Sequence, residues 1–264
     1  MPDSSQLVIG AGLDGLPIAQ AMRLANRHGL VAGATGTGKT VTLQRLAEAF
    51  SDAGVAVFAA DIKGDLCGLG AAGNPQGKVA ERIAGMPWLK HQPQAYPVTL
   101  WDIHGQSGHP LRTTLSEMGP LLLGSLLELT DSQQSALYAA FKVADREGLL
   151  LLDLKDLKAL LNHLKDNPQL LGDDAALMTT GSSQALLRRL ATLEQQGAEA
   201  LFGEPALQLE DILQPAADGR GRIHLLDASR LVHEAPKVYA TFLLWLLAEL
   251  FEHCLLYTSD AADE

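Results

Sequence analysis

The stretch from Leu30 to Leu46 reads LVAGATGTGKTVTLQRL and decides the fold. Within it, residues 33–40, GATGTGKT, match the pattern G-x-x-x-x-G-K-[ST] in full. A short apolar run precedes the match, and a helical pattern follows it. This is the order strand, glycine loop and helix in which phosphate-binding loops occur. The stretch therefore predicts a P-loop that binds a nucleotide.

The residue types of this loop fit that chemistry. Glycines let the backbone turn sharply and aim its N–H groups at phosphate oxygens, and the helix that follows adds the positive end of its dipole. A lysine reaches the β- and γ-phosphates as a point charge, and a threonine hydroxyl ligates Mg²⁺. The predicted cofactors are ATP and Mg²⁺, with Thr40 as the metal ligand. The predicted binding residues are Gly33, Ala34, Thr35, Gly36, Thr37, Gly38, Lys39 and Thr40.

Short apolar runs rich in Val, Ile and Leu predict strands around this loop. A helix over Lys39–Ser51 lies between the first two strands, which is the start of a parallel α/β unit. The predicted fold is therefore an α/β P-loop NTPase with a RecA-like parallel sheet and a mainly helical insertion. The expected strands are Leu30–Ala32, Val55–Ala60, Val98–Trp101 and Arg222–Asp227.

The chain divides into four expected parts. Residues 1–112 form the first part of the P-loop core, and residues 113–216 form the helical insertion. Residues 217–254 return to the core with a strand and a long apolar helix. Residues 255–264, LLYTSDAADE, fit neither and are expected to be a non-native tail. Helix-start signals within the insertion are Ser116, Asp131 and Asp153.

A second glycine-rich stretch, LVIGAGLDGLPIAQAM over residues 7–22, matches G-x-G-x-x-G at Gly10, Gly12 and Gly15. A dinucleotide fold also needs an acidic residue about 20 positions further on, to hold the ribose. No Asp or Glu occurs between Asp14 and Glu48. The expected structure here is a glycine-rich turn in an N-terminal strand or hairpin. A flavin or nicotinamide enzyme stays a third hypothesis, which preferential binding of NADH would revive.

Hydrolysis of a nucleotide needs a carboxylate that organises Mg²⁺ and a group that orients water. Three aspartates follow apolar runs, and each could instead cap a helix or a turn: Asp61, Asp102 and Asp227. None of them is followed by the Glu of a water-activating Asp-Glu pair. Asp61 is the candidate catalytic residue.

Composition limits the classes of function. The formal net charge is −11, which argues against a nucleic-acid binder that uses its whole surface, although a basic face or oligomer pore remains compatible. Two distant cysteines and an N-terminus without a signal peptide favour the cytoplasm. The apolar segment 238–257 contains Glu249, Glu252 and His253, so a soluble helix is expected there and no membrane partner.

The sequence resembles the bacterial HerA-helicase-like ATPases, relatives of the FtsK-type DNA pumps. The resemblance runs through RHGLVAGATGTGKTVTLQRLAEAFSDAGVAVFAADIKGDLCGL, VTLWDIHGQSGHPLR, the MGPLLL helix, GLLLLDLKDL and LEQQGAEALFGEP, over roughly residues 26 to 253. It implies a RecA-like core with a helical insertion, and ring-shaped homo-oligomers that act on DNA. It also implies that ATP sits between subunits and that a neighbour contributes an arginine.

The chain departs from this family near its end. There the Walker B strand, ending in Asp-Glu, follows the helix that matches Val238–Cys254. The terminal Asp263-Glu264 follows alanines and no strand. The expectation is an N-terminal fragment that ends before the Walker B, sensor and arginine-finger segments, and that binds nucleotide but hydrolyses it poorly. Asp65, within ADIKGDL, is expected either to contact a neighbour or the phosphate-side loop, or to form a turn.

The predicted function is the ATP-binding portion of a HerA-like helicase or DNA translocase, which couples ATP hydrolysis to movement on DNA in the full-length protein. The alternative is a P-loop regulatory module that acts on protein partners and not on DNA. The net charge and the lack of a basic stripe favour this alternative.

Overall fold

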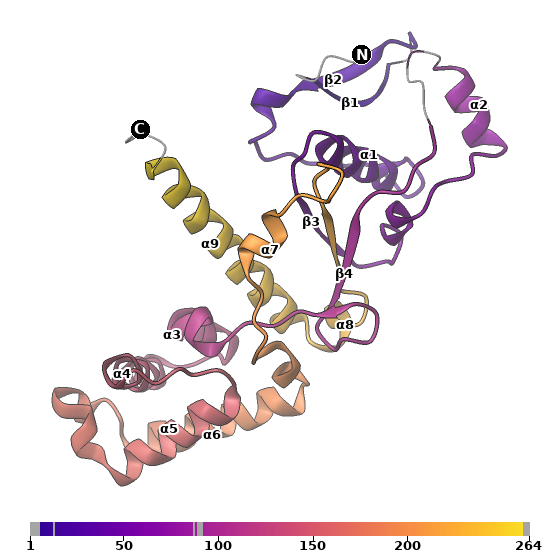
Figure 1. Cartoon of the computed structure of the whole chain (residues 1–264). Helices are drawn as coiled ribbons and strands as arrows, with labels where there is room; N and C mark the ends of the chain where they lie inside the picture. The colour runs from indigo at the N-terminus through magenta and orange to yellow at the C-terminus, as the bar shows by residue number, and fades with distance from the viewer. Residues whose placement is uncertain (1–5, 13, 87, 89–91, 261–264) are drawn as a thin grey trace. The chain divides into compact units, whose positions relative to one another are not determined.

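The computed structural model describes residues 6–12, 14–86, 88 and 92–260, which form two compact units (Figure 1). The first unit comprises Met1–Trp101 and Glu210–Asp227, and the second comprises Asp102–Leu209 and Ala228–Glu264. The elements that lie in the first unit, wholly or for all but one residue, are β1 (Gln6–Ala11), β2 (Pro17–Ala21), the 3₁₀ turn η1 (Met22–Leu24), α1 (Lys39–Asp52), β3 (Val57–Asp61), the 3₁₀ turn η2 (Cys67–Gly70), α2 (Lys78–Ala84), β4 (Val98–Asp102), α7 (Leu209–Leu213) and β6 (Ile223–Asp227).

The main sheet has four strands in the order β3-β6-β4-β5, with β5 at His109–Pro110. Strand β6 pairs in parallel with β3 on one side and β4 on the other, and Ile223 lies opposite both Val57 and Val98. Strands distant in the sequence therefore meet in one parallel sheet. This arrangement confirms the predicted α/β class and three of the four expected strands.

The fourth expected strand, Leu30–Ala32, is not formed, and this prediction was wrong. Residues 28–34 adopt neither helix nor strand, and the Leu30 side chain is 90% exposed. A strand exists only where its backbone pairs with a neighbour, and no strand within the described residues pairs with this segment. Three apolar residues in a row were too short a signal to show whether such a neighbour is present.

Helix α1 and turn η2 supply the residues that cover one face of the sheet. Ala47 of α1 packs with Leu66 and Leu69, and these contact Ile223 and Leu225 of the central strand. Burial of such apolar surface contributes roughly 25 cal/mol per Å². This small core fixes α1 against the strands, and it thereby places the loop that leads into α1.

The central strand also carries a buried histidine. His224 is 2% exposed, and its Nδ1 accepts a hydrogen bond of 3.0 Å from Nε1 of Trp101. Its Nε2 lies 3.0 Å from the carbonyl oxygen of Ile212. Because Nδ1 accepts, Nε2 carries the proton and donates it to that carbonyl. Burial lowers the pKa of the His224 imidazole, since the charged form loses its hydration.

The second unit is mainly helical. Leucines spaced three and four apart fill its interior, and those fully buried include Leu137 of α4, Leu157 and Leu161 of α5, and Leu186 and Leu190 of α6. Its remaining elements are α3 (Leu115–Leu126), α4 (Asp131–Glu147), α5 (Leu154–Asp166), the 3₁₀ segment η4 (Pro168–Ala176), α6 (Thr180–Gln195), the 3₁₀ turn η5 (Ala198–Leu201), α8 (Leu231–Glu234) and α9 (Pro236–Asp260).

The starts of these helices differ from two of the three expected signals. Asp153 caps α5 as expected, and its side chain accepts from the backbone N–H of Lys155 and Asp156. Helix α3 is instead capped by Thr114 and α4 by Thr130, each one or two residues before the expected Ser116 and Asp131. In both helices a side chain at N3, Glu117 or Gln133, completes a capping box, which favours these threonines.

Helix α9 extends to Asp260, past the expected end at Cys254. The last four residues of the expected non-native tail, 261–264, lie outside the described residues. No helix within the described ranges has the length and apolar character that crossing a bilayer requires.

Candidate nucleotide-binding site

The glycine loop of residues 33–40 turns through left-handed backbone conformations before α1 begins. Gly36 has φ of 80° and Gly38 has φ of 95°, where L side chains are strained. A Cβ at Gly33 would lie 2.4 Å from the Thr37 hydroxyl oxygen. Helix α1 then begins at Lys39, directly after Gly38. The backbone path therefore requires glycine at positions 36 and 38, whereas a side chain at position 33 would displace the Thr37 hydroxyl.

Lys39 folds back over this loop. Its Nζ donates hydrogen bonds to the carbonyl oxygens of Gly33 and Ala34, at 2.8 and 2.7 Å. The hydroxyl of Thr37 donates to the same Ala34 carbonyl at 2.8 Å. One positive charge is thus held within a turn of about eight residues at the N-terminus of a helix. A phosphate group is the ligand that such an arrangement favours.

Thr40, the predicted magnesium ligand, contacts a carboxylate. Its Oγ1 donates a hydrogen bond of 3.1 Å to Oδ2 of Asp65, which lies in the loop that follows β3. The carbonyl of Asp65 accepts a 2.9 Å bond from the Gln44 amide on α1. A hydroxyl and a carboxylate are oxygen donors of the kind that Mg²⁺ prefers, so the residues present fit that ion.

The candidate Asp61 has a different environment. It ends β3, is 5% exposed, and lies in register with Asp227 at the end of β6. Its carboxylate accepts hydrogen bonds from the backbone N–H groups of Lys63, Gly64 and Leu66, at 3.2, 2.8 and 2.9 Å. The Asp61 side chain therefore organises the loop that carries Asp65.

Asp102, at the end of β4, organises its own loop in the same way. Its carboxylate accepts from the backbone N–H groups of His104, Gln106 and Ser107, at 2.9, 2.7 and 2.9 Å. Burial raises the pKa of the Asp102 carboxyl, but these three hydrogen bonds outweigh burial and hold the pKa below its usual range. Two of the three strand-end aspartates therefore serve as turn-forming acceptors.

The sequence reasoning missed Gln44 and left the role of Asp65 open between two alternatives. In the structure Asp65 lies in the turn that Asp61 shapes and contacts Thr40 at the end of the glycine loop, which agrees with both the turn and the contact with the phosphate-side loop. A usable signal was present in DIKGD, because an aspartate at a strand end followed by glycine three residues later predicts a tight turn. After such a turn the side chain of Asp65 lies near the edge of the sheet, next to the glycine loop.

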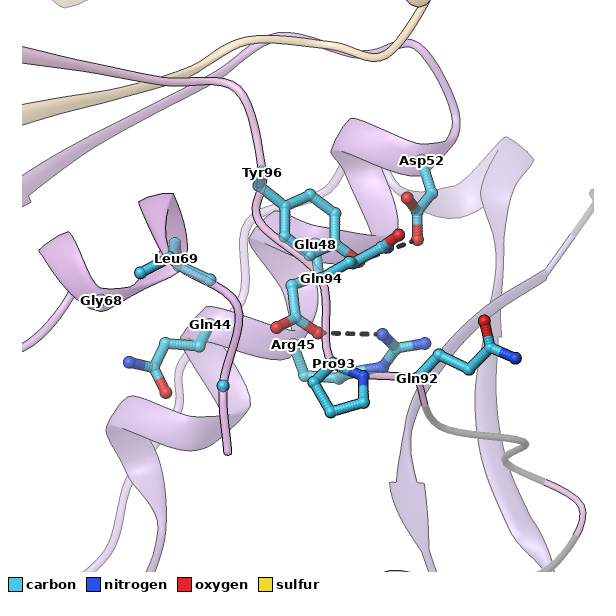
Figure 2. A pocket seen from close by; sticks show the side chains of 12 residues that line it. Gln44, Arg45, Glu48, Asp52, Gly68, Leu69, Gln92, Pro93, Gln94 and Tyr96 are labelled. Atoms are coloured by element: carbon cyan, nitrogen blue, oxygen red, sulfur yellow. Dashed lines mark hydrogen bonds and ion pairs between the residues drawn. The ribbon is translucent and has the colours of Figure 1, made fainter. Parts of the chain in front are cut away.

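A pocket of about 370 Å³ lies further along α1, between that helix, η2 and the segment before β4 (Figure 2). Its lining includes positively and negatively charged side chains, and Arg45 forms an ion pair of 3.0 Å with Glu48. Tyr96 lines it opposite α1 and donates its hydroxyl to Asp52 at 3.1 Å. Burial, more than the nearby carboxylate of Asp52, raises the pKa of the Tyr96 phenol.

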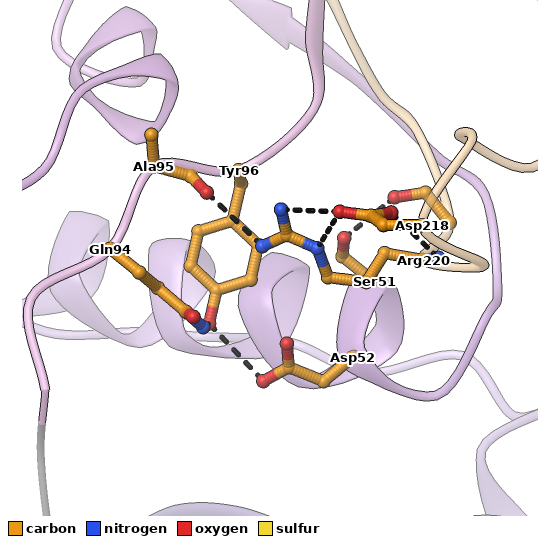
Figure 3. Close-up of polar contacts among 8 residues, drawn as sticks. Ser51, Asp52, Gln94, Ala95, Tyr96, Asp218 and Arg220 are labelled. Atoms are coloured by element: carbon orange, nitrogen blue, oxygen red, sulfur yellow. Dashed lines mark hydrogen bonds and ion pairs between the residues drawn. The ribbon is translucent and has the colours of Figure 1, made fainter.

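Tyr96 also belongs to a polar cluster that joins the end of α1 to the turn before β6 (Figure 3). The Arg220 guanidinium lies 5.2 Å from the centre of the Tyr96 ring and donates to the Ala95 carbonyl at 3.1 Å. Asp218 holds the same guanidinium at 2.7 Å. Ser51 donates to the Gly221 carbonyl at 2.6 Å. These hydrogen bonds and the ion pair connect the end of α1 to the turn before β6 and to the segment before β4.

Comparison with known proteins identifies the family of the chain. A search of the curated proteins finds no match to this chain. The family described as helicase HerA-like C-terminal matches residues 6–260, which include the glycine loop, the Asp61–Asp65 loop and both units. Since the match covers nearly the whole described chain, the chain belongs to the HerA-like helicase C-terminal family.

Proposed function

We propose that this chain binds ATP with Mg²⁺ through residues 33–40, as the nucleotide-binding part of a helicase or translocase ATPase. The observation that carries the proposal is the Lys39 ammonium, which two carbonyls of the glycine loop hold at the start of α1. Membership of the HerA-like helicase family supports an ATPase context for this loop. ATP hydrolysis would drive movement on DNA, with subunits arranged as a homo-oligomeric ring.

The roles of the loop residues derive from their chemistry. Backbone N–H groups of residues 33–38 would bind the phosphate oxygens, and Lys39 would exchange its two carbonyl partners for the β- and γ-phosphates. Thr40 would ligate Mg²⁺, which neutralises charge that develops on the phosphates during transfer. Lysine bonded to a charged group contributes about 1.5–3 kcal/mol, so Lys39 should dominate nucleotide affinity.

Equilibrium titration of the chain with a fluorescent ATP analogue and Mg²⁺ tests this proposal. Wild-type protein should bind saturably, and Lys39→Ala should lose about tenfold to a hundredfold in affinity. Lys155→Ala removes an exposed lysine of the helical unit and serves as the matched control, with unchanged affinity. Equal affinity of Lys39→Ala and wild type would contradict nucleotide binding by this loop.

The net charge of −11 favours a second function, a P-loop module that regulates protein partners and does not act on DNA. Negative charge opposes the approach of a phosphate backbone, which nucleic-acid binders attract with Lys and Arg. ATP turnover of the complete protein separates the two functions. Stimulation by DNA would support the motor, whereas a monomer that binds ATP and ignores every DNA tested would support the regulatory module.

A further inference from the structure

The loop between β3 and η2 is shaped by a buried carboxylate. Asp61 gathers the N–H groups of Lys63, Gly64 and Leu66, and Gly64 takes a left-handed φ of 73° within that turn. Leu66 anchors the far end of the loop in the core beside Ile223. The backbone of residues 61–66 is therefore fixed from both ends, and the side chain of Asp65 projects from a rigid turn.

This turn holds Asp65 against the first two turns of α1. Thr40 donates its hydroxyl to the Asp65 carboxylate at 3.1 Å, and Gln44 donates its amide to the Asp65 carbonyl at 2.9 Å. The two anchors are four residues apart on one face of the helix. The Asp65 side chain is exposed, so it does not contribute to the apolar core.

The direction of the hydrogen bond from Thr40 has a consequence for metal binding. A hydroxyl has one proton and two lone pairs. If its oxygen ligates Mg²⁺ through a lone pair, the proton must point elsewhere, and a carboxylate is the strongest acceptor available for it. The Asp65 carboxylate, fixed beside Thr40, sets the rotation of the hydroxyl and increases the electron density on its oxygen.

We propose that Asp65 is a positioning residue for Mg²⁺, which orients the Thr40 hydroxyl by accepting its proton. The proposal rests on the proposed nucleotide binding by residues 33–40. The proposal gives Asp65, and not the strand-end candidate Asp61, the role of the carboxylate that organises Mg²⁺. The carboxylate of Asp61 instead accepts hydrogen bonds from the backbone of its own loop.

The test measures the Mg²⁺ dependence of binding for the whole chain, with a fluorescent ADP analogue as probe. Affinity is determined in EDTA and across a series of MgCl₂ concentrations. Asp65→Asn should raise the Mg²⁺ concentration for half-maximal enhancement about tenfold, as loss of an outer-shell partner does. Affinity in EDTA should stay unchanged, and Asp65→Glu should restore part of the Mg²⁺ response. The exposed carboxylate variant Asp173→Asn is the matched control and should match wild type.

A double-mutant cycle with Thr40→Val identifies the route of the effect. If Asp65 acts through the Thr40 hydroxyl, Asp65→Asn should change nothing further in the Thr40→Val background. Circular dichroism and urea unfolding show whether each variant keeps the wild-type fold. An unchanged Mg²⁺ response in folded Asp65→Asn overturns the proposal, as does full additivity with Thr40→Val.

The same measurements separate this proposal from the proposed function. If Lys39→Ala loses nucleotide affinity and Asp65→Asn responds to Mg²⁺ as wild type does, the function stands and the role of Asp65 fails. If folded wild type binds no nucleotide in either condition, both fail.

Discussion

The two glycine-rich stretches of this chain have similarly spaced glycines but form different structures. The first stretch forms the antiparallel hairpin of β1 and β2, where Gly12 N–H donates to the Leu16 carbonyl at 2.8 Å and Gly15 N–H donates to the Gly12 carbonyl at 3.0 Å. Residues 33–40 lead into a helix and hold a lysine ammonium. The hairpin confirms the expected turn for the first stretch. Glycine supplies backbone freedom in both, and the element after the glycines, a strand or a helix, decides how that freedom is used.

Each stretch also depends on an aspartate, but in a different place. In the hairpin, Asp14 lies within the turn and accepts from its Leu16 N–H at 3.1 Å. The glycine loop instead meets the separate loop that Asp61 shapes, through Thr40 and Asp65. The hairpin turn is closed by hydrogen bonds among its own residues, with Trp88 as a further donor, whereas the candidate site combines two loops that are distant in the sequence.

Substitution of one glycine in each stretch is the strongest test of this difference. Gly38→Ala places a side chain at φ of 95°, and Gly15→Ala places one at φ of 76°. The strain of about 1–2 kcal/mol is similar in both. Gly38→Ala should weaken binding of a fluorescent ATP analogue by about 5- to 30-fold. Gly15→Ala should lower the urea midpoint and leave nucleotide affinity unchanged; weakened binding in both variants would make the two stretches one functional unit.

The aspartates provide the next test, measured as the free energy of unfolding in urea. Asp61→Asn replaces a buried carboxylate that accepts three backbone N–H groups, and should cost about 1.5–3 kcal/mol. Asp14→Asn changes an exposed acceptor of one N–H and should cost less than about 0.5 kcal/mol. Equal losses of unfolding free energy in the two variants would show that Asp61 stabilises its loop no more than Asp14 stabilises the hairpin turn.

A smaller effect than that of Asp61→Asn is expected at Trp88, whose Nε1 donates to the Gly15 carbonyl at 2.7 Å. Trp88→Phe removes this hydrogen bond and should cost about 1 kcal/mol in unfolding free energy. Nucleotide affinity should stay at the wild-type value, because the bond lies at the hairpin turn. Tyr138→Phe, at a half-exposed position of the helical unit, is the control. A loss of nucleotide affinity in Trp88→Phe would argue against independent roles for the two stretches.

Much of the sheet was predictable because its strands are short apolar runs that end in aspartate. The strands at Val57–Asp61, Val98–Asp102 and Ile223–Asp227 and helix α1 agree directly with that pattern. The residues of Leu30–Ala32 could not show that no strand forms there, because a strand depends on a neighbour with which its backbone pairs. Propensity describes a segment alone, whereas pairing is a tertiary property.

The candidate site was predictable in its glycine loop and less so in its carboxylates. A strand-end aspartate has the same sequence signature whether it faces a ligand or accepts N–H groups of its own turn, so the pattern alone did not show which of these roles Asp61 has. The two roles are separated by the hydrogen bonds that Asp61 accepts from Lys63, Gly64 and Leu66, and by the bond that Thr40 donates to Asp65. Such directions of side chains depend on backbone turns that sequence patterns describe poorly.

The buried imidazole of His224 makes the stability of the folded chain depend on pH in the mildly acidic range. In the folded chain both ring nitrogens are bonded and the pKa is lowered, whereas the unfolded chain takes up a proton near pH 6.5. The stabilising contribution is complete above that pH and is lost as the pH falls below it toward the folded pKa. Unfolding should therefore be accompanied by proton uptake at mildly acidic pH, and calorimetry in buffers of different ionisation enthalpy measures it. His224→Gln should reduce this uptake; unchanged uptake would assign it to the other histidines.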